Sequence, residues 1–162
     1  MGPVWDDAGT ANARAFPGRF DAPGFPALWV AEQVETCIAE VSHHLQVHCI
    51  DHQPGLRVQD FLFTLLEVPI AGAFDDLRGR RASIQGLLAP TGTAHAMARR
   101  YARRACLDGW DGLIHASARH RGGTCLARFV LTGLRIPTRA IGWVQFHGTG
   151  KRLIRRPPVI QA

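Results

Sequence analysis

The apolar residues that follow position 33 constrain the fold most, because their spacing fits one face of a helix and does not fit a strand. They recur three and four residues apart: Val34, Cys37, Ile38, Val41 and Leu45. Glu35 lies in the first turn, where the helix dipole favours negative charge. The apolar run at residues 27–31 is too short for a helix and predicts a buried strand. The ordered part of the chain is therefore expected to open with a strand and an amphipathic helix.

The rest of the sequence contains one more helical pattern and is otherwise dominated by strand patterns. We expect a helix at residues 94–106 and strands at residues 61–70, 112–116, 125–131, 141–146 and 152–154. The glycine pair Gly122-Gly123 permits a tight turn between the strands at 112–116 and 125–131. These patterns predict an α+β fold with mixed or antiparallel sheets and a few helices, rather than a doubly wound parallel sheet.

The length of 162 residues fits a single small domain. Residues 1–16 are rich in Gly, Ala and Asp and lack an apolar period, which predicts a flexible N-terminal segment before a domain at residues 17–156 and a tail at 157–162. No apolar stretch is long enough to cross a membrane, and the first residues do not resemble a signal segment. We therefore expect a cytoplasmic protein without a membrane partner.

The net charge of +6 comes almost wholly from arginine, because Lys151 is the only lysine. Arginine suits bidentate contacts with phosphate or carboxylate, so the charge favours an anionic ligand or an acidic partner. The alternative is that the arginine pairs simply solvate the surface. Direct nucleic-acid binding is not expected, because the aromatic residues fall mainly within the predicted strands and no reader motif is present.

Three histidines have a spacing that could place metal ligands on one face of a helix. His44, His48 and His52 would share one face of a continuous helix, but Pro54 predicts that His52 lies in a loop, which favours surface histidines and no metal site. The four cysteines include no C-x-x-C pair and are interpreted as buried thiols. Phosphate-loop, serine-hydrolase and dinucleotide-binding motifs are also missing from the sequence.

Two groups of short motifs remain. The first is Pro17-Gly18-Arg19-Phe20, followed by Ala27-Leu28-Trp29-Val30-Ala31 and by the helix segment Glu35-Thr36-Cys37-Ile38-Ala39-Glu40-Val41. The second runs from Asp111-Gly112-Leu113 through Ser117, Arg119 and Gly122-Gly123 to Cys125 and Phe129. Their order and spacing resemble the RES domain, which has a G-R-[FW] loop, an L-Y-x-A strand, a helix reading E-T-A-x-A-E-V, and a segment D-G-[LI]-x-x-x-S-x-R-x-x-G-G-x-C-x-A-x-F.

The resemblance implies a fold like that of ADP-ribosyltransferases. It also implies a bacterial toxin, usually encoded beside an Xre-like antitoxin, which depletes NAD by phosphorolysis or hydrolysis of the nicotinamide-ribose bond. NAD would be the substrate and inorganic phosphate a co-substrate, with no prosthetic group and no metal. Two alternatives stay open: an ADP-ribosyltransferase acting on a macromolecule, and a catalytically inactive basic binding module.

The resemblance assigns roles to four residues. Arg19 would bind the diphosphate, Glu40 would orient a ribose hydroxyl and stabilise positive charge, Trp29 would stack on nicotinamide, and Ser117 would supply a hydrogen bond. Without the resemblance, composition and pattern favour Arg19 and Glu40 as surface residues and Trp29 as a core residue, and Ser117 can simply end a strand.

The chain also departs from the family pattern at three places. Trp29 replaces the usual tyrosine, residues 91–95 replace a Tyr or Ser and a Gln, and residues 1–16 lack an opening Tyr-Arg strand.

Overall fold

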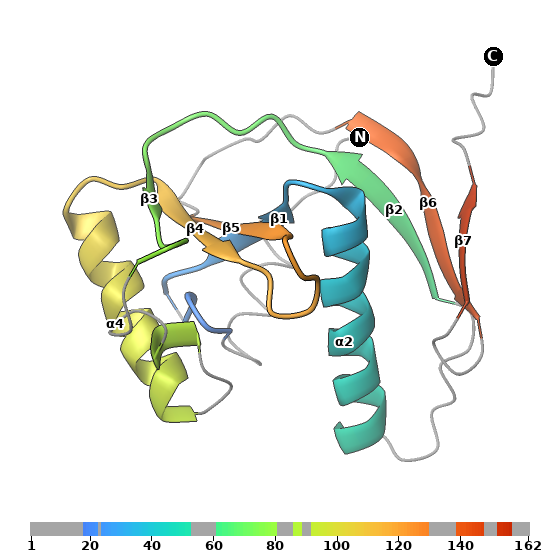
Figure 1. Ribbon diagram of the computed structural model, residues 1–162, viewed down its shortest axis with the longest axis horizontal. Helices are drawn as coiled ribbons and strands as arrows, with labels where there is room; N and C mark the ends of the chain where they lie inside the picture. The colour runs from blue at the N-terminus through green and yellow to red at the C-terminus, as the bar shows by residue number, and fades with distance from the viewer. Residues whose placement is uncertain are drawn as a thin grey trace. The chain divides into compact units, whose positions relative to one another are not determined.

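The computed structural model describes residues 18–22, 24–52, 61–80, 86–88, 92–129, 139–147 and 152–156 (Figure 1). The chain divides into two compact units. The first contains Met1–Cys37 and Ala71–Leu134, and the second contains Ile38–Ile70 and Arg135–Ala162. Helix α2 (Val34–His52) starts in the first unit and continues in the second.

A mixed sheet with the strand order β1-β5-β4-β3 forms the centre of the first unit. Its strands are β1 (Ala27–Ala31), β3 (Phe74–Asp76), β4 (Gly112–Ala116) and β5 (Thr124–Phe129). Strand β5 pairs antiparallel with both β1 and β4, whereas β3 pairs parallel with β4. This arrangement leaves β1 as an edge strand, and β1 carries Trp29 opposite Ala127.

Helix α4 (Gly92–Leu107) packs beside this sheet together with the short 3-10 helix η1 (Gly86–Leu88) (Figure 1). The alanines of α4 that recur at helical spacing are buried, namely Ala94, Ala98, Ala102 and Ala105. Their small side chains let the helix approach the larger core residues Phe20, Leu113 and Phe129. The arginines of α4 lie on the rest of its surface, so the helix is amphipathic in the expected sense.

The second unit contains an antiparallel sheet with the order β2-β6-β7. Its strands are β2 (Phe61–Glu67), β6 (Arg139–His147) and β7 (Arg152–Arg156). A register shift interrupts the β2–β6 ladder between Leu65 and Leu66. At the end of that ladder, Arg139 Nε donates a 2.8 Å hydrogen bond to Glu67.

These elements confirm the predicted α+β fold with mixed and antiparallel sheets. The strand predicted at residues 61–70 ends earlier, at Glu67. The boundary predicted for α2 was also wrong, because the helix continues to His52 instead of ending before it. The reason is local, because Pro54 disfavours helical geometry only at the preceding residue, Gln53. A histidine metal site would depend on the side chains of His48 and His52, which are not among the described side chains. The segments 1–16 and 157–162 lie outside the described residues.

Strand β3 was not predicted, since it is three residues long and two of them are aspartates, which have low strand propensity. Cysteine burial is also only partly as expected, because Cys125 is buried whereas Cys37 and Cys106 are half-buried, and Cys49 lies outside the described side chains. None of the helices in the described part of the chain has both the length and the apolarity that a membrane crossing requires.

Candidate functional site

The loop Gly18-Arg19-Phe20 lies directly against the indole of Trp29. Phe20 is fully buried and anchors the loop in the core of the first unit. A Cβ atom at Gly18 would lie 3.5 Å from Trp29 Cζ2 and would collide with the Asp21 carboxylate. Glycine therefore lets the backbone approach the Asp21 carboxylate closely, and a larger residue before Arg19 would force this carboxylate to shift.

Two arginine side chains of the first unit bring positive charge to this loop, one from within the loop and one from α4. Arg19 is half-buried, and its Nη1 donates a 3.2 Å hydrogen bond to the carbonyl of Leu87. Arg99, on α4, donates from Nη1 to the carbonyl of Gly18 at 3.3 Å. The pKa of His95 is lowered by partial burial and then by the charges of Arg19 and Arg99. Positive potential is thus concentrated around the loop, which suits an anionic ligand.

Trp29 has one side of its ring system in the core and the rest open to solvent. It stacks on Phe20 at a ring-centroid distance of 5.7 Å and meets His115 edge-on at 5.9 Å. The residue nevertheless remains 41% exposed. The interpretation of Trp29 as a core residue is therefore only half right. The exposed part of the indole can stack on a planar ligand.

Asp21 follows the loop and was not singled out from the sequence. Its residue exposure is 7%, and burial raises the pKa of its carboxyl, although the Gly18 backbone, the charge of Arg99 and the Trp29 indole act in the opposite direction. Its Oδ1 has no hydrogen-bond partner among the described residues. The only sequence signal for this residue is its place directly after the Gly-Arg-Phe motif, since a lone aspartate in a loop gives no periodic pattern.

Ser117 organises the turn between β4 and β5. Its backbone N–H donates to the carbonyl of Gly123 at 2.8 Å, and its Oγ accepts hydrogen bonds from the backbone N–H groups of Arg119 and His120 at 3.1 and 2.9 Å. These contacts give Ser117 a turn-forming role. Its predicted hydrogen bond to a ligand stays a prediction.

The same turn reaches the first turn of α2. His120 Nδ1 lies 2.7 Å from the hydroxyl of Thr36, a fully buried residue. Gly123 also packs closely here, because a Cβ atom at this position would collide with Thr36 and lie 2.9 Å from His120 Nδ1. The serine-to-glycine motif therefore fixes the start of α2.

Glu40 lies one helical turn after Thr36 on α2, and it belongs to the second unit. Periodicity alone places Glu40 on the polar side of the helix, but the residue is half-buried and therefore not fully solvated. The other three predicted site residues belong to the first unit. Arg19 lies in the loop beside Trp29, Trp29 lies on β1, and Ser117 lies in the turn after β4.

The comparison with known families agrees with the motifs that make up this geometry. The chain matches the RES domain over residues 2–145 of its 162 residues. It belongs to the RES domain family. The matched region contains all four predicted site residues. No curated protein and no solved structure matches the chain.

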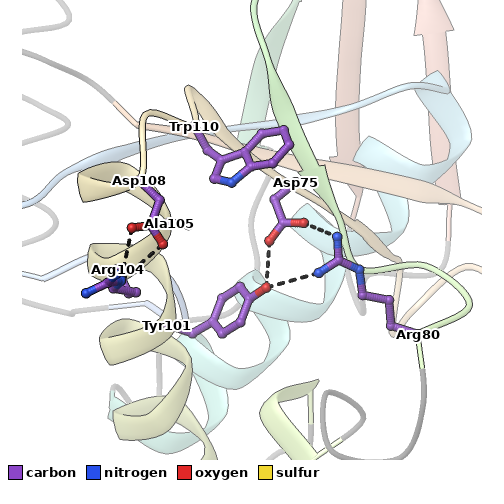
Figure 2. Close-up of a pocket in the computed structure, with 7 residues that line it drawn as sticks. All are labelled: Asp75, Arg80, Tyr101, Arg104, Ala105, Asp108 and Trp110. Atoms are coloured by element: carbon purple, nitrogen blue, oxygen red, sulfur yellow. Dashed lines mark hydrogen bonds and ion pairs between the residues drawn. The ribbon is translucent and has the colours of Figure 1, made fainter.

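The RES domain of this chain also contains a surface pocket of about 260 Å³ that is lined by residues of β3, of α4 and of the segments that follow them (Figure 2). Asp75 is buried there and forms an ion pair with Arg80. The Tyr101 hydroxyl donates to Asp75 Oδ2 at 2.6 Å and accepts from Arg80 Nη1 at 3.3 Å. Because the three groups satisfy one another, we interpret this cluster as structural, tying β3 to α4.

Proposed function

We propose that this RES domain cleaves the nicotinamide-ribose bond of NAD and acts as a toxin by depleting the cell of NAD. The observation that carries the proposal is the close packing of the Gly18-Arg19 loop against the exposed Trp29. A guanidinium group and an open indole ring beside one backbone loop match two parts of NAD that need recognition, its anionic diphosphate and its planar nicotinamide.

Arg19 would bind the diphosphate through its planar guanidinium fork. The carbonyl of Leu87 holds one of its nitrogens, which restricts the side chain before a ligand arrives. The neighbouring charge of Arg99 makes the environment locally positive, and the charges of Arg19 and Arg99 add to the effect of burial in lowering the pKa of His95. Trp29 would stack on nicotinamide, although the indole lacks the hydroxyl of the family's usual tyrosine.

The reaction is a substitution at the anomeric carbon of the ribose. The bond from that carbon to the nicotinamide nitrogen breaks, and its electron pair leaves with neutral nicotinamide. Positive charge develops on the sugar in the transition state, and the carboxylate of Glu40 would stabilise it while accepting a hydrogen bond from a ribose hydroxyl. An oxygen of inorganic phosphate or of water forms the new bond and, in the case of water, loses its proton to solvent.

The remaining assignments follow the same chemistry. Ser117 would give one hydrogen bond to the ligand in addition to its role in the turn. The reaction needs no prosthetic group and no metal, because the leaving group already carries positive charge before the bond breaks. An Xre-like antitoxin would be the protein partner that restrains the activity, and the cytoplasm, where NAD is present, would be the location.

The test is NAD consumption by the purified chain, with and without inorganic phosphate. Arg19→Ala is expected to slow turnover about tenfold to a hundredfold, which is the effect of losing a charge-assisted contact. Glu40→Gln is expected to slow it about a hundredfold or more, since it removes transition-state charge stabilisation. Arg121→Ala is the matched control, because Arg121 is an exposed arginine in the turn after β4.

Each result has a defined meaning. Turnover that depends on phosphate indicates phosphorolysis, and turnover without phosphate indicates hydrolysis. Label transferred from NAD to a protein or nucleic acid would favour an ADP-ribosyltransferase instead. If the folded wild-type chain, freed from any antitoxin, leaves NAD intact, the catalytic proposal is wrong and a binding module is the better interpretation.

A further inference from the structure

Arginines of this chain differ in whether a carboxylate neutralises them. Four of them form ion pairs within the described residues: Arg78 with Asp76, Arg80 with Asp75, Arg104 with Asp108, and Arg139 with Glu67. Arg100 and Arg103 on α4 are exposed, and neither has a hydrogen bond or an ion pair to any described residue. Their charge is therefore available to something outside the described part of the chain.

These two arginines line a hollow on the surface of the first unit. The hollow has a volume of about 250 Å³, and its lining consists of Ala22, Ala96, Arg99, Arg100 and Arg103. The two alanines are short, so they leave room between the guanidinium groups. None of the described residues that line the hollow is acidic, so its guanidinium groups give it a positive charge that suits an anion.

The spacing of the three arginines makes this site costly without a ligand. Arg99 and Arg103 are four residues apart on α4, and Arg100 and Arg103 are three apart, so Arg103 is a helix-surface neighbour of both. Like charges at these spacings destabilise a helix, by about 0.2–0.5 kcal/mol per pair. Arg99 donates to the Gly18 carbonyl, and its charge also acts on the Asp21 carboxylate, where it opposes the effect of burial on the pKa. The charge that no described residue compensates is therefore that of Arg100 and Arg103.

We propose that the hollow formed by Ala22, Ala96, Arg99, Arg100 and Arg103 binds a phosphoryl group. Guanidinium forks bind phosphate oxygens in a bidentate manner, and several of them around one hollow can contact different oxygens of the same group. The phosphoryl group comes from free inorganic phosphate or from a nucleotide such as ADP-ribose. The hollow shares Arg99 with the surroundings of the Gly18-Arg19-Phe20 loop, but Arg19 does not line it. The proposal does not depend on NAD cleavage, because it is defined by binding.

The experiment is calorimetric titration of the full chain with inorganic phosphate and, separately, with ADP-ribose at low ionic strength. The double variant Arg100→Gln with Arg103→Gln is expected to weaken phosphate binding about tenfold or more. Arg104→Gln with Arg121→Gln is the control, because it removes the same charge from exposed positions outside the hollow. This control is expected to change the affinity less than about threefold, because exposed charges outside the hollow interact only weakly with the bound anion. The double lysine variant at positions 100 and 103 keeps the charge but loses the forks, and we expect it to fall in between.

The outcomes separate the sources and the alternatives. Phosphate binding that persists in Arg19→Ala and fails in the Arg100/Arg103 glutamine variant supports the proposal with free phosphate as the source. If only ADP-ribose binds, and the same glutamine variant weakens it, the proposal holds with a nucleotide as the source. Equal weakening by the control variant, or no binding of either compound by folded protein, overturns it. Binding of a duplex oligonucleotide alone, lost in the glutamine variant, also overturns it in favour of a nucleic-acid surface.

Discussion

The hydroxyl of Thr36 lies 2.7 Å from Nδ1 of His120, which joins the first turn of α2 to the turn after β4. The two residues are 84 positions apart, and Thr36 is fully buried. Ser117 and Gly123 shape the same turn, so a motif that resembles part of a ligand site also fixes the helix that carries Glu40. Recognition motifs of the RES domain are thus partly explained by packing.

Replacement of Thr36 by valine should therefore destabilise the fold. Valine keeps the shape but removes the hydroxyl, and a half-buried imidazole nitrogen loses its partner. We expect the free energy of unfolding in urea to fall by about 1–2 kcal/mol. Thr93→Val is the control at an exposed position of α4, with an expected change within about 0.5 kcal/mol. Equal stability of Thr36→Val and wild type would show that the contact contributes nothing.

Gly18 should tolerate no side chain, because a Cβ atom would collide with Asp21 and touch Trp29. Gly18→Ala is expected to lower the free energy of unfolding by about 1–3 kcal/mol, the usual cost of overpacking. Gly86→Ala is a suitable control, since a Cβ atom there meets nothing within 4 Å. Thermal and urea unfolding of both variants measure the difference. A Gly18→Ala protein as stable as the Gly86→Ala protein would contradict the packing described for the loop.

Tyr101 should be needed to keep Asp75 satisfied. Its hydroxyl donates a 2.6 Å hydrogen bond to this buried carboxylate, so Tyr101→Phe leaves one oxygen of Asp75 with less compensation (Figure 2). We expect the free energy of unfolding to fall by about 1–3 kcal/mol. Asp75→Asn in the Tyr101→Phe background gives the coupling between the two residues through a double-mutant cycle. A coupling energy near zero would mean that the hydrogen bond does not stabilise the fold.

Tyr101 also supports a test by pH, because it is the only tyrosine in the chain. Partial burial, the hydrogen bond to Asp75 and the charge of Asp75 raise the pKa of its hydroxyl. The folded protein therefore holds this proton more tightly than the unfolded chain does. Its contribution to stability is complete below the unfolded pKa of about 10 and is lost as pH rises through the higher folded pKa. Ultraviolet absorbance of phenolate formation in native and urea-unfolded protein measures both values, and identical titrations would refute the prediction.

Local patterns were sufficient to predict much of the fold. The strand at residues 27–31, the start of α2 at Val34 and the two strands around Gly122-Gly123 follow from spacing and turn chemistry, and all are present. Strand β3 was missed because its formation depends on parallel pairing with β4, far along the chain. The burial of Thr36 and its contact with His120 also depend on residues far apart in the sequence, so no local pattern predicts them.

The candidate site shows the same division. The Gly18-Arg19-Phe20 loop and Trp29 were identified from motifs, and the structure adds the reason for the glycine and the half-exposed state of the indole. Asp21 was missed, because a buried carboxylate in a loop can be identified only from its surroundings. The uncompensated charge of Arg100 and Arg103 could not be predicted either, because the sequence does not show which arginines form ion pairs with carboxylates.

Asp21 gives the last prediction. Burial raises the pKa of its carboxyl, so the folded state disfavours the charged form relative to the unfolded chain. The contribution of this group to stability is therefore complete below the unfolded pKa of about 4 and is lost as pH rises through the folded pKa. Asp21→Asn removes this titration, so its stability relative to wild type should increase between pH 4 and pH 7. Urea unfolding of the two proteins at both pH values measures the change. A difference that stays constant, or that moves toward wild type as pH rises, would show that the Gly18 backbone, Arg99 and Trp29 outweigh burial at this carboxylate.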